Sequence, residues 1–209
     1  MEAYFNLFLQ QAISFAAIMD PVGVSAMMLA MLPHQATHAE VNAIARRSSL
    51  TVLVAFAVVL ASGDMILRLF GIDQYSLKVI GGIVLLMMAI EMLGNGEGGR
   101  MLSGGKDRED IAVIPLGIPI IFGAGLFTVV IVFRQQAGNW QDLFVTILAF
   151  SVNIMALYLA LRYAILIRKW LGETAEKVVT KLMGIITGAI AVQFIVSGVV
   201  VLGKKFWGS

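Results

Sequence analysis

Six apolar stretches separated by short polar segments follow one another along the chain, at about 4–32, 43–70, 77–93, 111–133, 143–167 and 178–202. A helix needs about 20 mainly apolar residues to cross a bilayer core about 30 Å thick, so most of these stretches are long enough. The pattern predicts an all-α, polytopic membrane protein with six transmembrane helices. The pair Thr37 and Glu40 has the spacing of a capping box at the start of the second helix, and 168–177 is predicted as a basic loop before the sixth.

Two of the six stretches contain residues that interrupt a helix. The first holds Asp20-Pro21-Val22-Gly23, and the fourth holds a run from Pro115 through Pro119 to Gly123-Ala124-Gly125. A carboxylate at bilayer depth is costly, and proline removes a backbone donor from the helical ladder. Because such breaks are tolerated where the chain lines a site, we predict that helices 1 and 4 are broken and that the breaks form the functional centre.

A glycine-rich, charged segment at 95–110 separates two sets of three spans. It predicts a flexible cytoplasmic linker between a first repeat, 1–94, and a second repeat, 111–209, within one membrane domain. A shift of 103 residues places Asp20 over Gly123 and Gly81 over Gly184. Since each half has an odd number of spans, the second half must enter the membrane from the opposite side, which makes the repeat inverted.

Composition excludes most other classes of protein. Of 209 residues, 59% are hydrophobic and 13% charged, and the mean hydropathy of +0.91 is far above that of a soluble domain. The formal charge of +2 does not indicate nucleic acid, because the basic residues lie at the ends of the apolar stretches. Cysteine is absent, so there is neither a disulfide framework nor thiolate chemistry. The start Met1-Glu2 lacks a positively charged region, so no cleaved signal peptide is predicted.

The distribution of basic residues predicts the orientation. The segments after spans one, three and five carry ten lysines and arginines: Arg46, Arg47, Arg100, Lys106, Arg108, Arg162, Arg168, Lys169, Lys177 and Lys181. The other side carries five: Arg68, Lys78, Arg134, Lys204 and Lys205. By the positive-inside rule the first set faces the cytoplasm and both termini face outward.

These residues together resemble the MarC family of six-span inner-membrane proteins, which includes small neutral amino-acid transporters of the SnatA type. The resemblance rests on Asp20-Pro21-Val22-Gly23, on Gly81-Gly82 in the third span, and on Pro115 and Pro119 before a Gly-x-Gly. It covers essentially the whole chain. Two departures are present: Ala124 stands where the family usually has proline, and Val24-Ser25 where relatives often have asparagine and proline.

Each break leaves unpaired backbone N–H groups at the start of the next half-helix, which favour an anion such as a substrate carboxylate. Asp20 would receive the substrate's ammonium group or a coupling proton or sodium ion. The resemblance implies a bacterial or archaeal inner-membrane transporter whose substrate is a small zwitterion such as glycine or alanine. The candidate substrate-binding residues are Asp20, Pro21, Gly23, Val24, Ser25, Gly123, Ala124, Gly125, Leu126 and Asn153.

Other interpretations stay open. Asp20 could serve only as a helix cap, without touching a ligand. The chain could be a channel-like or non-transporting membrane protein that affects resistance indirectly, or an intramembrane enzyme, although no second carboxylate stands at helical spacing from Asp20. His34 and His38 lack an obvious third ligand, so neither a metal site nor a cofactor is predicted. Membrane lipid is the expected surrounding, nucleic acid is not a partner, and a homo-oligomer is compatible with the sequence.

Overall fold

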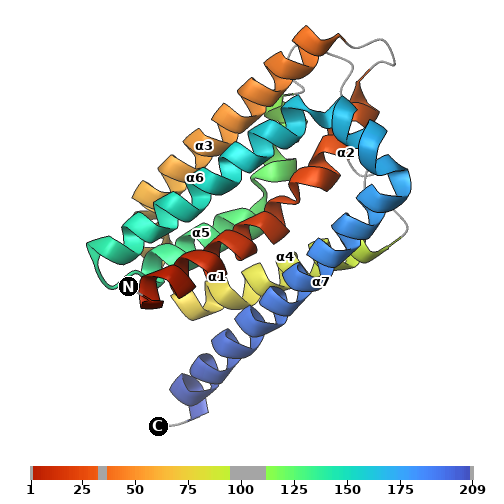
Figure 1. The fold of residues 1–209 in the computed structure, drawn as a ribbon. Coiled ribbons are helices and arrows are strands. Elements are labelled where there is room, and N and C mark those ends of the chain that lie inside the picture. Colours follow the sequence, from red (N-terminus) through yellow and green to blue (C-terminus); the bar gives the residue numbers. More distant parts are fainter. Residues whose placement is uncertain (1, 33–36, 95–111, 208–209) are drawn as a thin grey trace.

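The computed structural model describes residues 2–32, 37–94 and 112–207, and every regular element in these segments is a helix (Figure 1). The elements are α1 (Glu2–Met19), α2 (Pro21–Met31), α3 (His38–Leu69), α4 (Gln74–Leu93), the distorted helix η2 (Ala112–Ile121), α5 (Ala124–Gln136), α6 (Trp140–Arg162) and α7 (Ala164–Trp207). The all-α prediction is confirmed. The predicted linker, 95–110, lies outside the described residues.

Five stretches of the described chain are long and apolar enough to cross a membrane: Glu2–Met31, His38–Gly63, Gln74–Leu93, Trp140–Arg162 and Ala164–Lys205. The fourth predicted span corresponds instead to η2 followed by α5. With 13 residues, α5 covers only about 20 Å, which is less than the apolar thickness of a bilayer. The structure thus supports a multi-span membrane protein, while the count of six spans stays a prediction.

Local capping fixes where several helices begin. The N–H of Thr37 donates to Glu40 Oε2 at 2.7 Å, and the N–H of Glu40 donates to Thr37 Oγ1 at 3.3 Å, which is the predicted capping box at the start of α3. Asp73 caps α4 by accepting a 2.7 Å hydrogen bond from the N–H of Tyr75.

The predicted basic loop at 168–177 is wrong. Apart from one residue, this segment is helical and belongs to α7. The exception is Gly172, whose φ of 69° and ψ of 164° lie in a region that residues with a side chain rarely adopt. Glycine therefore permits a sharp bend between a short first part of α7 and the long second part, without a loop in between.

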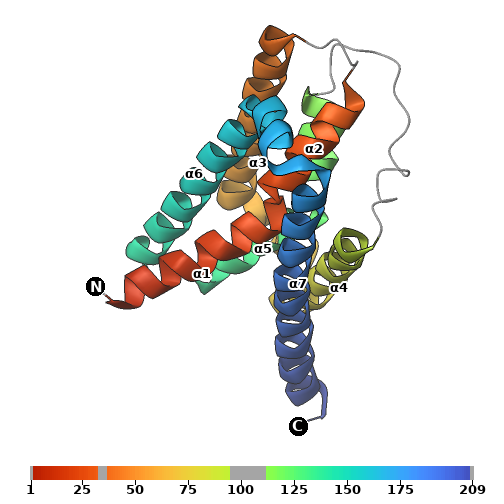
Figure 2. The same ribbon diagram turned by 45° about the vertical axis from the view of Figure 1, so that its right-hand side comes forward.

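The helices pack in a pattern that joins distant parts of the sequence. Helix α4 lies along α7, α1 lies along α6, and α3 contacts α6, η2 and α5 (Figures 1 and 2). Four aromatic rings join α1, α3, α5 and α6 at the centre: Phe56 stacks on Phe150 with centroids 3.7 Å apart, and Phe15 meets Phe150 and Phe133 edge-on at 5.2 and 5.4 Å. This core holds the ends of α1 and α5 in place.

Candidate functional site

The first interruption consists of a single residue. Helix α1 ends at Met19, α2 begins at Pro21, and Asp20 between them has φ 37° and ψ 69°, a left-handed conformation. Among the described residues it is the only one other than glycine with a positive φ. Aspartate tolerates this region better than most residues. Because Pro21 has no N–H, the Ala17 carbonyl receives no hydrogen bond from it, and the helical ladder stops here.

The Asp20 side chain closes the start of α2. Its Oδ1 accepts a hydrogen bond from the Gly23 N–H at 3.1 Å, and the Thr180 hydroxyl of α7 lies beside its carboxylate. Asp20 is only 5% exposed. The carboxylate therefore acts as the N-cap of α2 and links this helix to α7, so the interpretation of Asp20 as a structural cap has direct support.

The absence of a side chain at Gly23 makes this cap possible. A Cβ atom at this position would overlap Asp20 Oδ2 and would lie 2.8 Å from Thr180 Oγ1. Any larger residue would have to displace the carboxylate, the hydroxyl or both. Gly23, Asp20 and Thr180 thus form one packed unit at the first interruption.

The second interruption has a different construction. Helix α5 begins after Gly123, which has φ −90° and ψ −173° and provides no side-chain cap. The Gly123 carbonyl accepts from the Phe127 N–H at 3.0 Å, as expected at a helix start. The N–H groups of the first turn, at Ala124, Gly125 and Leu126, have no partner within a helix, and no side chain closes this end.

The first turn of α5 is open on one side and packed on the other. Gly125 is buried against α4, because a Cβ there would lie 2.8 Å from Leu85 Cδ2. Ala124 is exposed, and Gly123 is half-buried. Both line an open, mainly apolar groove of about 790 Å³ along α3, together with Leu50, Thr51, Val54, Ala55, Val58, Val59, Ile118, Phe122 and Phe127. The uncapped end of α5 can therefore be reached from this groove.

The two interruptions belong to neighbouring elements. Helix α2 contacts η2, the segment just before the second interruption, and α1 contacts α5. The α1–α2 interruption lies near the middle of the bundle in both views (Figures 1 and 2). Ser25 and Thr128 occupy similar places in the two half-helices: both are buried, and their hydroxyls donate to Val22 O and Ala124 O at 2.7 and 2.9 Å.

Other predicted site residues occupy less direct positions. Pro21 is the half-buried first residue of α2, and Val24 is buried one turn on. Asn153 is buried between α6 and α1, where its side-chain nitrogen donates to Ala12 O at 3.1 Å and Ala149 O at 2.8 Å. Ala12 lies two turns before Asp20, so Asn153 joins two helices, and its contact with a substrate stays a prediction.

Sequence reasoning missed two residues at the first interruption. Thr180 touches Asp20 from α7, and Glu176 lies four residues before it on the same helix. Glu176 is 6% exposed, and its Oε1 has no hydrogen-bond partner. Because 168–177 was predicted as a loop, Glu176 was not considered as part of a buried helix face. The spacing of these two residues, read as one face of a helix, was the available signal.

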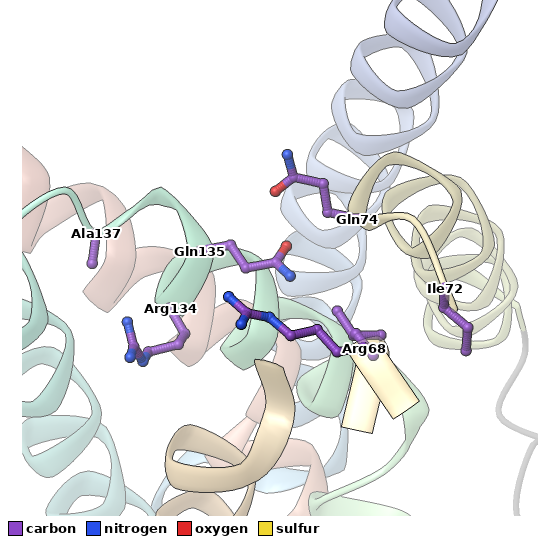
Figure 3. A pocket seen from close by; sticks show the side chains of 7 residues that line it. Arg68, Ile72, Gln74, Arg134, Gln135 and Ala137 are labelled. Atoms are coloured by element: carbon purple, nitrogen blue, oxygen red, sulfur yellow. The ribbon is translucent and has the colours of Figure 1, made fainter. Parts of the chain in front are cut away.

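A second hollow lies where α3 and α5 end, on the side that the basic residues assign to the outside. It measures about 320 Å³ and is lined by Leu67, Arg68, Ile72, Gln74, Arg134, Gln135 and Ala137 (Figure 3). Arg68 and Arg134 stand in the last turns of their helices. Positive charge there complements the negative end of a helix dipole, so we interpret both arginines as residues that stabilise the C-terminal ends of α3 and α5.

Within the described residues no group of three His, Asp or Glu side chains could hold a metal ion. His34, one of the two histidines considered from the sequence, lies outside them.

Residues 5–202 match the MarC family of integral membrane proteins. A UPF0056 membrane protein of Buchnera aphidicola is 28% identical over 93% of this chain and 92% of its own length. One from Methanocaldococcus jannaschii is 33% identical over 71% of this chain and 76% of its own, and YhcE of Escherichia coli is 29% identical over 94% and 91%. No solved structure shows significant similarity.

Proposed function

The chain belongs to the MarC family of integral membrane proteins, and on that premise we propose that it is a secondary transporter of small neutral amino acids such as glycine and alanine. The substrate is held between the two interruptions near the bilayer midplane, and the two halves of the protein expose it to each side in turn. This function is of the SnatA type that the sequence resembles.

The observation that carries the proposal is the opposite polarity of the two interruptions. Asp20 brings a buried carboxylate to one, whereas the other presents backbone N–H groups without a cap. A zwitterion needs both: its ammonium group is attracted by a carboxylate, and its carboxylate by a helix N-terminus. In a medium without competing water, each interaction is stronger than at a protein surface.

The close packing around both interruptions supports a small substrate. No Cβ fits at Gly23, and a Cβ at Gly125 would lie 2.8 Å from Leu85. The space near the polar groups is therefore bounded by atoms that a large side chain would displace. Glycine and alanine have the smallest side chains of the amino acids and therefore fit that space best.

The helix contacts support an inverted repeat of 1–94 and 111–209. Helix α2 of the first half packs on α6 and α7 of the second, and α5 of the second half packs on α3 and α4 of the first. Gly82 lies against Ile195, and Gly184 lies against Met92. Met92 and Ile195 are 103 residues apart and Gly82 and Gly184 are 102 apart, so the two contacts correspond to within one residue of the offset seen in the sequence. Such a repeat provides two halves that can exchange roles during alternating access.

We further propose that the protein lies in the cytoplasmic membrane of a bacterium or archaeon with both termini outside, following the distribution of lysine and arginine. Transport is favoured over catalysis because neither α1 nor α2 offers a second carboxylate at helical spacing from Asp20 that could share acid and base roles with it.

Purified protein in proteoliposomes tests the proposal. With unlabelled alanine inside, radiolabelled glycine should enter faster than into empty liposomes, and a pH or sodium gradient should drive its accumulation. Protein-containing vesicles that take up neither glycine nor alanine above the empty control, with or without either gradient, would contradict it. Empty liposomes and liposomes with an unrelated membrane protein are the controls.

A further inference from the structure

Glu176 is a buried carboxylate that the proposed substrate site does not use. It is 6% exposed, and its Oε1 accepts no hydrogen bond. Leaving a charged oxygen buried without a partner is costly, so natural proteins keep such groups where they bind something. Glu176 therefore requires an explanation.

Its position relative to Asp20 provides one. Glu176 and Thr180 are four residues apart in the continuous helix after Gly172, so they share a face with Cβ atoms roughly 5–6 Å apart. The Thr180 hydroxyl lies beside the Asp20 carboxylate, since a Cβ at Gly23 would meet both. Thr180 thus follows Glu176 by one turn along α7, with Asp20 beside its hydroxyl and Glu176 nearer the bend at Gly172.

We propose that Glu176, Thr180 and Asp20 form a proton path that couples amino-acid transport to the proton gradient; this inference rests on the proposed transport function. A protonated Glu176 passes its proton to the Thr180 oxygen, directly or through a water, while the Thr180 hydroxyl proton moves to Asp20. Glu176 is then a carboxylate, Asp20 is a neutral acid, and Thr180 is again a hydroxyl.

The charged groups around Glu176 fit this role. Arg168 and Glu173 in α7 act on it electrostatically from the basic segment predicted to face the cytoplasm. Helix α2 has no charged side chain beyond its cap Asp20, and in α1 the only charged residue is Glu2 at its start. In α4, Glu91 is exposed near the level of Gly184, two turns away, and in α6 Arg162 lies against Tyr158. The path therefore leads from the basic end of the molecule to the interruption.

The path connects to the substrate site through Asp20. Protonation of Asp20 removes the charge that attracts the substrate's ammonium group, so a proton and the ammonium group compete for the same carboxylate. Such competition links the direction of proton movement to substrate release.

The first test measures coupling. Vesicles containing a pH-sensitive dye should show proton movement together with glycine movement for the wild type. Glu176→Gln should reduce gradient-driven accumulation roughly tenfold relative to glycine exchange, a typical size for a coupling effect. Thr180→Val should do the same. Glu91→Gln, which removes an exposed carboxylate of α4, is the matched control and should behave as the wild type.

The second test does not need transport. A hydrophobic carbodiimide adds to protonated carboxylic acids in apolar surroundings, and mass spectrometry locates the adduct. Labelling of Glu176 should increase as pH falls from about pH 8 to pH 5, whereas exposed Glu91 serves as the control. Absence of labelling over this range, or accumulation by Glu176→Gln equal to that by Glu91→Gln, would overturn the path even if the protein transports glycine. Accumulation driven by sodium alone, with sodium protecting Glu176 from labelling, would also overturn it.

If the wild type moves no amino acid, the proposed function fails and the coupled path fails with it. Labelling then decides separately whether Glu176 holds a proton, so the two failures are distinguishable.

Discussion

The two helix interruptions differ in how the first N–H groups of the following helix find hydrogen-bond acceptors. At Asp20 the chain provides its own carboxylate to the start of α2, and Gly23 makes room for it. At Gly123 the chain provides nothing, and the start of α5 borders an open groove. One interruption is therefore complete within the protein, while the other needs a ligand or water to satisfy its N–H groups. This asymmetry favours binding of a zwitterion with its ammonium group at Asp20 and its carboxylate at the start of α5.

The largest effect is expected from a large side chain at Gly23, where the Asp20 carboxylate and the Thr180 hydroxyl already fill the space. Gly23→Leu should displace Asp20 and Thr180 and reduce glycine transport by about a hundredfold or more, because small misplacements at a site have effects of that size. Gly188→Ala is a matched control, since a Cβ there meets only Ala89 Cβ at an ordinary 3.4 Å. Both variants should insert into the membrane. Normal transport by a well-inserted Gly23→Leu protein would show that the Asp20 unit has no part in it.

The next substitution separates the cap from the charge. Asparagine caps helices about as well as aspartate, so Asp20→Asn should keep the thermal stability but weaken glycine binding by roughly tenfold or more, as expected when a charged hydrogen bond becomes neutral. Asp20→Ala should lose both, with a stability loss of about 1 kcal/mol. Stability in detergent and glycine exchange across pH check this pair. Unchanged exchange in Asp20→Asn would leave the residue only a structural role.

A third substitution adds to the second interruption a carboxylate cap like the one that Asp20 provides at the first. Gly123 has an extended backbone that any residue can adopt, so Gly123→Asp can cap α5. Replacing a glycine cap by aspartate should raise stability by only about a few tenths of a kcal/mol. If the N–H groups of α5 bind the substrate carboxylate, the new side chain should compete with it and raise the glycine concentration for half-maximal exchange several-fold, by about 1 kcal/mol or more. Gly138→Asp, at an exposed position, is the control. An unaltered glycine dependence would remove α5 from the site.

The smallest effect is expected far from either interruption. Lys205 donates to Asp73 Oδ2 at 2.8 Å, and this hydrogen bond, with that from Tyr75, lowers the pKa of the half-buried Asp73 carboxyl. A lowered pKa in the folded protein contributes stability above the unfolded value of about 3.9, which is lost as the pH falls through the folded pKa. Lys205→Met should therefore lower stability at neutral pH, though only slightly because Lys205 is exposed to solvent, and should leave glycine exchange unaffected. A marked loss of exchange in this variant would mean that the ends of α4 and α7 take part in transport.

The sequence predicts the chemistry of the first interruption better than its surroundings. Proline and aspartate within an apolar stretch have few uses, so they mark Asp20–Gly23 in advance. The contact from Thr180 comes from a helix about 160 residues later, and only the tertiary packing of α2 on α7 reveals it.

One error of sequence reasoning has a local cause. The polar composition of 168–177 suggested a loop, but a single glycine at 172 suffices for the bend while its neighbours stay helical.

Asn153 stood out as a polar residue at membrane depth, and its partners prove to be backbone carbonyls of α1 and α6. A sequence shows that a buried amide needs partners, but not whether they come from a ligand or from the chain.

The most direct test of a site made from two unlike interruptions is competition by amino-acid analogues that lack one charge. Glycinamide has no carboxylate, and N-acetylglycine has no ammonium group. In vesicles that exchange radiolabelled glycine, alanine should compete, whereas neither analogue should compete at the same concentration. Competition by either analogue as strong as that by alanine would contradict a site in which Asp20 and the start of α5 each hold one end of the substrate.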